Sequence, residues 1–286
     1  MKTIIYSLIA IFIFGIIATG FSHKSDNSLR ILIQSSDDNI SAAVLNKSAE
    51  IITGRLKSFS DEKFIITTLP EKNQIQLIFP GQHDLKRIEN LLTQKGNLEF
   101  YEIYNHSNIS KLLKDDGKLL SMFHEYASHD SSAEIGCISN TEISKVNAYL
   151  NSVKQIQDCK FSWSNLFEDT NVCLYALRIK NGNGVLLRGS DIESFKSEYE
   201  KTLARESIKF KFKPSATAKW AEVTKRNLNS AIAIVLDDNV IYAPVVRSEI
   251  TDGNCQISGD FTPTQVRFLV AIGGNGELPV NFYVVK

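Results

Sequence analysis

Four acidic residues in the C-terminal part of the chain are the first candidates for chemistry, because convergent carboxylates can act as acid and base or hold a cation. Asp237, Asp238, Asp252 and Asp260 lie within one short segment. Each also stands where the chain is expected to reverse, and aspartate favours turns because its side chain bonds to nearby backbone groups. We interpret all four as turn residues and predict no catalytic residue or metal site among them.

His124 and His129, with the neighbouring Glu125 and Asp130, are the other candidate metal ligands. Their spacing places the two imidazoles off a common helical face, and no second pair of ligands stands nearby. We expect a solvated loop there. The sequence also lacks the motifs of serine hydrolases, zinc proteases and phosphate-binding loops. We therefore predict neither an enzyme nor a cofactor.

The overall charge narrows the class of protein further. The 286 residues include 32 basic and 32 acidic side chains, so the formal net charge is zero. Nucleic-acid binders usually carry a basic excess, so nucleic acid is not an expected partner. Lys209, Lys211 and Lys213 form a basic stripe that could meet anionic lipid or acidic polypeptide. We interpret the stripe instead as a solvated sheet edge, where lysine discourages aggregation.

The four cysteines are Cys137, Cys159, Cys173 and Cys255. Four cysteines allow three full pairings, and their spacing does not choose among them. None forms a C-x-x-C pair, which argues against a redox or zinc motif. Buried free thiols and a single disulfide are both open, and a disulfide would require an oxidising compartment.

The N-terminus predicts export from the cytoplasm. Residues 4–21 (IIYSLIAIFIFGIIATGF) are apolar and uncharged. As a helix they would extend about 27 Å, close to the roughly 30 Å of a bilayer core. A cleavable signal peptide would use Ala18 and Gly20 as the small residues before a cut near Phe21. An uncleaved anchor would leave the rest of the chain outside the cytoplasm. Residues 1–28 are thus expected to form a signal or transmembrane helix and a polar tether.

The elements that must position these residues follow from hydrophobic periodicity. Asp38 or Asn39 is the expected cap of the first helix after the tether. The pattern predicts strand, helix, strand, strand, helix and strand at 29–34, 40–59, 64–69, 74–79, 85–92 and 97–104. This order is the ferredoxin-like split β-α-β arrangement, an antiparallel sheet with helices on one side. The fold class is therefore α+β.

The second half of the chain is harder to interpret, but its last third has a clear pattern. A hairpin is expected to reverse at 237–239, where Asn239 can supply a left-handed conformation, and Pro244 interrupts its second strand. Thr141 is an expected helix cap, and Thr262 with Pro263 opens the last helix. The expected helices are 141–153, 215–227 and one from 263, and the strands are 171–180, 207–213, 231–236, 256–261 and 278–285.

The order of residues in this last third is the most informative feature of the chain. A fixed pattern is formed by Val235, Leu236, Asp237, Ala243, Pro244, Ile250, Gly253, Gln256, Ile257, Ser258, Gly259, Phe261 and Thr262. It resembles the first periplasmic domain of the SecD/SecDF family, membrane proteins that assist protein export through the Sec channel. Shorter matches to the same family, in the same order, include Ile51, Ile52, Arg55, Ile75, Leu77, Pro80, Gly81, Gly96, Leu98, Glu99, Phe100, Trp220, Val223 and Thr224. The resemblance covers roughly residues 29–104 and 186–286.

This resemblance implies a domain organisation and a location. A base subdomain at 29–104 would carry an inserted α+β head subdomain at 105–277, and 278–286 would return to the base as a strand. SecD proteins begin with a retained helix, which favours the anchor at 1–28 and a single-pass protein of the bacterial inner membrane with a periplasmic C-terminal domain. After residue 21 no apolar run is long enough to replace the family's proton-conducting helices. We therefore expect a stand-alone module that does not pump protons.

The resemblance also implies a polypeptide partner, because head subdomains of this family are proposed to contact emerging polypeptide. Unfolded chains bind to apolar grooves and to unpaired strand edges. Tyr242, Pro244, Val246 and Arg247 are the candidate polypeptide-binding residues, because proline confines their strand to an edge or bulge. Ordinary core packing is the alternative for each of them.

The expected function is that of a membrane-anchored, non-enzymatic accessory of Sec-dependent protein export. It would bind translocating or newly exported polypeptide, or dock on components of the Sec channel. The alternative is a stand-alone envelope binding module that reuses the SecD fold without Sec partnership, because a fold does not fix a function.

Overall fold

A computed structural model of the 286-residue chain describes residues 28–80, 85–113, 117–126, 132–152, 157–180, 184–201 and 204–285. Within these ranges the side chains of Arg87, Ser110, Glu125 and Tyr126 are not described. The apolar run at 4–21 lies outside the described residues, as do His129 and Asp130. No helix in the described ranges is long and apolar enough to cross a bilayer.

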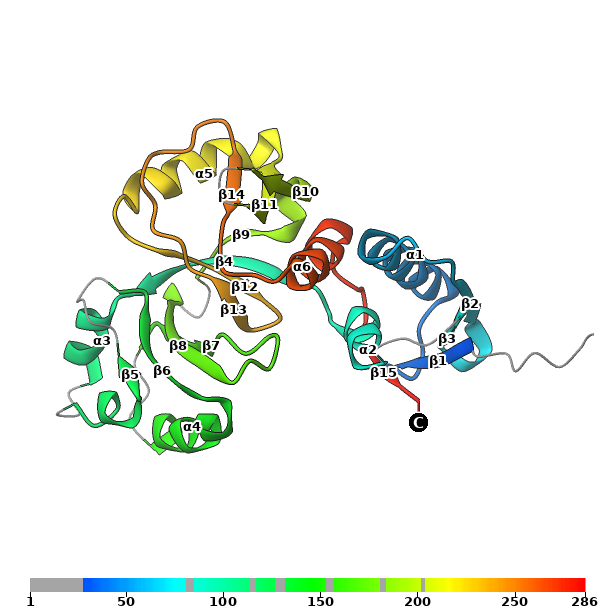
Figure 1. Cartoon of the computed structure of the whole chain (residues 1–286), viewed down its shortest axis with the longest axis horizontal. Coiled ribbons are helices and arrows are strands. Elements are labelled where there is room, and N and C mark those ends of the chain that lie inside the picture. Colours follow the sequence, from blue (N-terminus) through cyan, green and yellow to red (C-terminus); the bar gives the residue numbers. More distant parts are fainter. Residues whose placement is uncertain are drawn as a thin grey trace, which may run out of the picture.

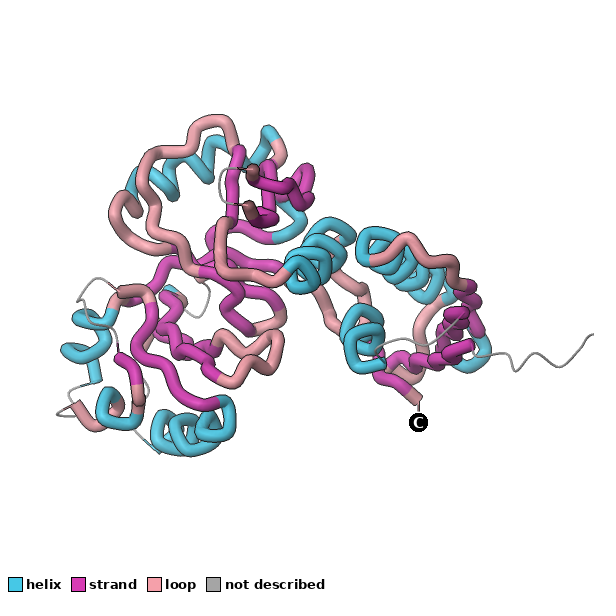
Figure 2. Tube along the Cα trace, in the orientation of Figure 1, coloured by secondary structure: helices cyan, strands magenta, loops and turns pink. Residues whose placement is uncertain are grey.

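The chain forms a smaller base and a larger head, with helix α6 between them (Figure 1). The base holds a four-stranded sheet in the order β15-β1-β3-β2, in which every neighbouring pair is antiparallel. Its two helices lie on one side of the strands (Figure 2). The base elements are β1 (Ser28–Ser35), α1 (Ala42–Phe59), β2 (Ile65–Leu69), β3 (Gln74–Pro80), α2 (Leu85–Thr93) and β15 (Phe282–Val284).

Local sequence explains these elements well. Burial alternates along β1 and β3, which places Ile31 and Ile33 under the helices, as a half-buried strand requires. Helix α1 begins one residue after Ser41, whose hydroxyl accepts a hydrogen bond from the Val44 amide at 3.3 Å. The expected cap at Asp38 or Asn39 is therefore wrong, because a capping side chain must directly precede the first turn.

The strand expected to complete the base belongs to the head instead. Strand β4 (Leu98–Tyr104) pairs with β12 (Ile232–Leu236) in the register of Leu98 with Leu236, and it has no partner in the base sheet. The fourth place in the base is filled by β15, which pairs Ile33 with Val284. The ferredoxin-like order is thus present, but its last strand comes from the C-terminal end. The assignment of 97–104 to the base is wrong because alternation fixes which face of a strand is buried, not its partner.

The head is built on two sheets. The larger runs β13-β12-β4-β8-β6-β5, with β7 on β8 and β9 on β4, and the smaller runs β10-β11-β14. The head strands are β5 (Glu125–Tyr126), β6 (Glu134–Ser139), β7 (Cys159–Trp163), β8 (Asn171–Arg178), β9 (Val185–Arg188), β10 (Ile192–Glu200), β11 (Arg205–Phe212), β13 (Asn239–Tyr242) and β14 (Asn254–Ile257). The head helices are α3 (His106–Leu113), α4 (Ile143–Ser152) and α5 (Pro214–Arg226).

Short 3₁₀ turns join several of these elements, at Pro70–Lys72, Leu120–Met122, Asn140–Glu142 and Gly189–Asp191. The turn before α4 is capped by the Ser139 hydroxyl, so the expected cap at Thr141 is wrong. Strand β14 ends at Ile257, so the strand expected at 256–261 lies about two residues earlier and is shorter.

Helix α6 (Pro263–Asn275) links the two parts of the molecule. It begins as the sequence predicts: Thr262 and Gln265 form a capping box, and Pro263 occupies the first turn. The helix packs against α1 of the base and against β10 and β11 of the head. One hydrophobic core therefore runs through both parts, and a second core lies between β6, β7, β8 and the two short helices α3 and α4.

Candidate functional site

Asp237 holds the head to the chain segment that enters it. Its carboxylate accepts hydrogen bonds from the amides of Gly96 at 2.9 Å and Asn97 at 2.8 Å. Asp237 and Asp238 adopt φ values of 48° and 66°, which form the reversal between β12 and β13. The expectation that Asn239 supplies the left-handed residue is wrong, because the two aspartates share that conformation. Asp237 is therefore a structural residue at the head–base junction.

Arg55 of α1 binds the same junction from the base side. It is fully buried, and burial lowers the pKa of its guanidinium to about 10, partly offset by the charge of Asp237. Its Nη1 donates to the carbonyls of Leu91 at 3.3 Å and Gln94 at 2.6 Å, and its Nη2 donates to Lys95 at 3.0 Å and Gly276 at 2.9 Å. The first three carbonyls lie where the chain leaves the base for the head, and that of Gly276 lies where the chain returns to the base. Arg55 therefore joins these two connecting segments.

The other acidic residues of the segment do not converge. Asp238 pairs with Lys160 of β7, and Asp260 lies 3.1 Å from Arg205. Asp252 accepts from the side chain and the backbone of Asn254, and these hydrogen bonds lower its pKa. The four aspartates, interpreted from the sequence as turn residues, each have a separate set of partners.

Of the two histidines considered as metal ligands, the structure describes His124 and not His129. The imidazole Nε2 of His124 lies 2.5 Å from the carboxylate of Glu142. Throughout the described ranges, no group of three or more histidine, cysteine or acidic side chains is placed to hold a metal ion.

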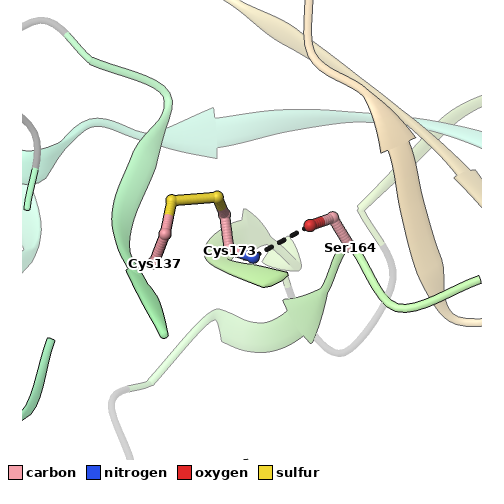
Figure 3. Close-up of a disulfide and its surroundings, with 3 residues drawn as sticks. All are labelled: Cys137, Ser164 and Cys173. Atoms are coloured by element: carbon pink, nitrogen blue, oxygen red, sulfur yellow. Dashed lines mark hydrogen bonds between the residues drawn. A yellow bond between two sulfur atoms is a disulfide. The ribbon is translucent and has the colours of Figure 1, made fainter. Parts of the chain in front are cut away.

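Cys137 of β6 and Cys173 of β8 form a disulfide across two neighbouring antiparallel strands (Figure 3). The amide of Cys173 also donates to the Ser164 hydroxyl at 2.9 Å, which ties the adjoining loop to the same strand. Cys159 and Cys255 are free, and burial raises the pKa of each thiol to about 12. The sequence left open a single disulfide or buried free thiols. The structure contains one disulfide and also two partly buried free thiols.

An apolar cavity of about 240 Å³ lies in the head, between α5, β14 and the loop that follows β13. We call it the head pocket. Part of its lining is a cluster of aromatic rings in which Phe100 packs against Phe210 in a tilted geometry and against Trp220 edge to face, at centroid distances of 5.7 and 5.6 Å. The pocket is lined by Phe100, Phe210, Trp220, Thr224, Ile232, Ile234, Pro244, Val245, Val246, Arg247, Ser248, Ile250, Asn254, Cys255, Gln256 and Ile257.

Three of the four candidate polypeptide-binding residues line this pocket. Pro244, Val246 and Arg247 do so, and Val246 is largely buried at 9% exposure. Tyr242 does not: its ring packs on Phe261, and its hydroxyl donates to the Ser258 carbonyl at 3.4 Å. The expected strand through Pro244 is also absent, because β13 ends at Tyr242 and Pro244 lies in the following loop.

The remaining motif residues shape the neighbourhood of the pocket. Gly253 adopts a φ of 72° directly before β14, a conformation that side chains disfavour. Gly259 lies against the ring of Phe261, where a Cβ atom would be 2.6 Å from the ring. These three residues therefore fix the path of the chain at both ends of β14 and take no direct part in lining the cavity.

The sequence did not single out the polar groups of the pocket. Trp220 is 5% exposed, and its indole Nε1 has no nitrogen or oxygen partner. The indole is directed toward the thiol of Cys255, which is only a weak acceptor. Trp220 was visible as part of the family pattern, but nothing in a single sequence shows that its N–H is left without a strong acceptor.

The lysine stripe does not mark a sheet edge. Strand β11 lies between β10 and β14, so it is the central strand of its sheet. Lys209 pairs with Glu198 at 2.7 Å and Lys211 with Glu193 at 3.3 Å, while Lys213 donates to the Ser190 carbonyl at 2.6 Å. The edge interpretation is wrong: Lys209 and Lys211 pair with acidic residues of β10, and Lys213 follows β11 and bonds to the turn before β10.

The fold defines a class of α+β domains with a ferredoxin-like base and an inserted two-sheet head. A solved structure described as "Structure and function of a membrane component SecDF that enhances protein export" superposes with a TM-score of 0.55 at 21% identity. It covers 90% of this chain and 98% of the solved chain. A SecDF structure described as a super-membrane-facing form gives a TM-score of 0.56 at 22% identity, over 91% of this chain and 30% of the other.

Sequence comparisons agree with the fold. The family described as "SecDF, P1 head subdomain" matches residues 172–280. The protein translocase subunit SecD of Calditerrivibrio nitroreducens is 43% identical over 79 residues, which are 28% of this chain and 15% of that protein. SecD of Acidaminococcus fermentans is 34% identical over 105 residues, which are 37% of this chain and 25% of that protein. The matches therefore span a quarter or less of these two relatives.

Residues 172–280 match the SecDF P1 head subdomain, and the fold of the chain is similar to that of SecDF. The resemblance stated from its sequence motifs is confirmed by the family match and by the shared fold.

Proposed function

We propose that the chain is a non-enzymatic accessory of Sec-dependent protein export. In this role its head pocket binds translocating or newly exported polypeptide, or its head docks on components of the Sec channel. The observation that carries the proposal is the apolar pocket whose lining, apart from Phe100, lies in the segment that matches the SecDF P1 head and includes Pro244, Val246 and Arg247. Such grooves bind unfolded chains because burial of apolar side chains drives association.

The proposed location is the outer side of the bacterial inner membrane. In this proposal residues 1–28 form a single-pass anchor and a tether, and the described residues lie in the periplasm. The Cys137–Cys173 disulfide supports an oxidising compartment, because disulfides persist there and are rare in the cytosol. The names of the relatives support the same placement, since the solved SecDF is described as a membrane component that enhances protein export.

The alternative proposal is an envelope binding module that reuses this fold without Sec partnership. The matches reach 15% and 25% of the two SecD proteins described above, so partnership with the Sec channel belongs to the proposal and not to the comparison. A fold can be retained while its partners change, so the partners must be tested directly.

In-cell photocrosslinking tests the proposal. Val245 is 38% exposed and lines the head pocket, so a photoreactive residue at this position crosslinks to molecules that bind there. Ile65 in the base strand β2 is 61% exposed and provides the matched control position.

We expect Sec channel subunits or exported chains in transit to be captured from Val245 and not from Ile65. Equal capture from both positions would contradict the head pocket as the binding site. Capture of neither class from actively exporting cells would contradict the export role and leave the envelope binding module.

A further inference from the structure

The free edge of β14 borders the head pocket. Strand β14 pairs with β11 on one side only, and it has no other strand partner among the described residues. The Phe212 amide donates to the Gly253 carbonyl at 3.0 Å, which makes that pair a hydrogen-bonded one. Hydrogen-bonded and non-hydrogen-bonded pairs alternate along an antiparallel ladder. The pairs of Phe210 with Cys255 and Ile208 with Ile257 are therefore also hydrogen-bonded.

It follows that the backbone of Gln256 points away from β11. Gln256 is opposite Lys209 in a non-hydrogen-bonded pair, so its N–H and C=O are directed to the outer edge. Asn254 has the same orientation, but its amide is bonded to the Asp252 carboxylate at 3.0 Å. Gln256 lines the pocket and its side chain is exposed. The edge beside the pocket therefore presents one donor and one acceptor to an incoming strand.

Trp220 also lines the pocket, and its one donor has only the weakly accepting thiol of Cys255 beside it. The indole Nε1 of Trp220 is buried and has no nitrogen or oxygen partner. A buried donor whose partner is a weak acceptor gains from a ligand that brings a stronger one. Around it the lining is apolar, with Arg247 as the one charged side chain of the pocket. A carbonyl oxygen next to an apolar side chain fits both features.

We propose that the head pocket binds an extended, uncharged segment of polypeptide as an added strand on the outer edge of β14. The segment pairs with the N–H and C=O of Gln256 and inserts one bulky apolar side chain over the Trp220 ring. This inference rests on the proposed function for its partner, a polypeptide, and adds the mode of recognition. Main-chain pairing gives affinity for many sequences, and the pocket selects one apolar residue.

Peptide binding to the full-length chain in lipid nanodiscs tests the proposal. The chain has two tryptophans, so the Trp163→Phe variant leaves Trp220 as the only indole reporter. The probe is a blocked peptide of about seven residues, a usual strand length, with threonine and serine around a central leucine. We expect saturable change in Trp220 fluorescence, and at least tenfold weaker binding when the leucine is replaced by aspartate.

N-methylation of the peptide distinguishes strand addition from simple apolar binding. Successive amides of a strand point to opposite edges, so methylating alternate residues blocks one edge and leaves the other free. One of the two methylated peptides should bind about tenfold or more weakly, and the other should bind like the parent. Equal binding of both methylated peptides and the parent would overturn the proposal.

Two variants of the protein test the same edge from the other side. Gln256→Pro removes an amide that is not part of the β14–β11 ladder, and Gln256→Val is the matched control that keeps it. We expect loss of peptide binding in the first and not in the second, with thermal unfolding of both compared to the parent. If Gln256→Pro does not fold, binding of the methylated peptides to the parent protein still tests whether the peptide adds as a strand.

The outcomes also separate this inference from the proposed function. Crosslinks from Val245 to exported chains, together with binding that ignores N-methylation, would retain the export role and overturn strand addition. Edge-specific binding of the peptide without such crosslinks in cells would retain strand addition and contradict the export role.

Discussion

The buried Arg55 gives the sharpest prediction about stability. Replacing it with methionine keeps a long apolar stem but removes the donors to four carbonyls at the two chain crossings. Hydrogen bonds from a charged donor contribute about 1.5 kcal/mol each, or about 6 kcal/mol for four. Relief of the guanidinium desolvation and burial of the methionine side chain offset about 2 kcal/mol. We expect Arg55→Met to lower the free energy of unfolding by about 4 kcal/mol, a large share of a typical total.

Urea unfolding followed by circular dichroism measures this loss. The control is Arg30→Met in the neighbouring strand β1, where the side chain is exposed and the change should stay within about 0.5 kcal/mol. Arg55→Lys keeps the charge but cannot reach all four carbonyls, so it should lie between the two. A loss below about 1 kcal/mol for Arg55→Met would refute the reasoning, because the unpaired carbonyls would then cost little.

Three further predictions concern the head. Cys137 and Cys173 are separated by 36 residues, and the entropy of closing a loop of that length is worth about 4 kcal/mol. Replacing both with serine should therefore lower the free energy of unfolding by about 4 kcal/mol. Unchanged urea unfolding would contradict this. The thiols of Cys159 and Cys255 have a pKa of about 12 against the usual 9.0. At about pH 8 they should therefore react with iodoacetamide on the order of a thousandfold more slowly in the folded than in the urea-unfolded chain. Fast labelling of the native protein would contradict this, because it would show accessible thiolates. For Glu102, burial raises the pKa, but hydrogen bonds from neighbouring Asn and Arg side chains outweigh it, so the pKa lies below 4.5. The stabilising effect of the ionised carboxylate is therefore present at neutral pH and lost as the pH falls below that value. Glu102→Gln should show a smaller drop in unfolding midpoint between about pH 7 and about pH 3.5 than the parent, and an equal drop would contradict the shift.

The sequence predicted the elements whose formation is local. Alternation along β1 and the periodicity of α1 are properties of neighbouring residues, and both elements lie where the pattern placed them. Strand β4 shows the limit of this reasoning. Its assignment as a strand is correct, but its first four residues are all buried and its partners are β12, β9 and β8, which are contributed by residues far along the chain. Pairing between distant segments is not encoded in the pattern of either one alone.

The candidate site was predictable in outline only. The motif around Pro244 located the loop that borders the head pocket, because its residues resemble a known family. The roles of single residues were not accessible: Tyr242 packs on Phe261, and Trp220, identified only as part of the family pattern, lines the pocket. The outer edge of β14 depends on which pairs in the β11–β14 ladder are hydrogen-bonded, and only the register provides that information.

The position of β15 sets an order in which the molecule can assemble. Strands β1, β2 and β3 and helices α1 and α2 are contiguous in sequence, whereas the strand that completes their sheet pairs Ile33 with Val284. Contacts of such long sequence separation form late, because the intervening chain must first be ordered. A chain that emerges N-terminus first thus presents its head, including β4 and β12, before the base gains its last strand and before α6 covers α1. Without β15, the edge of β1 in the base sheet has no strand partner among the described residues.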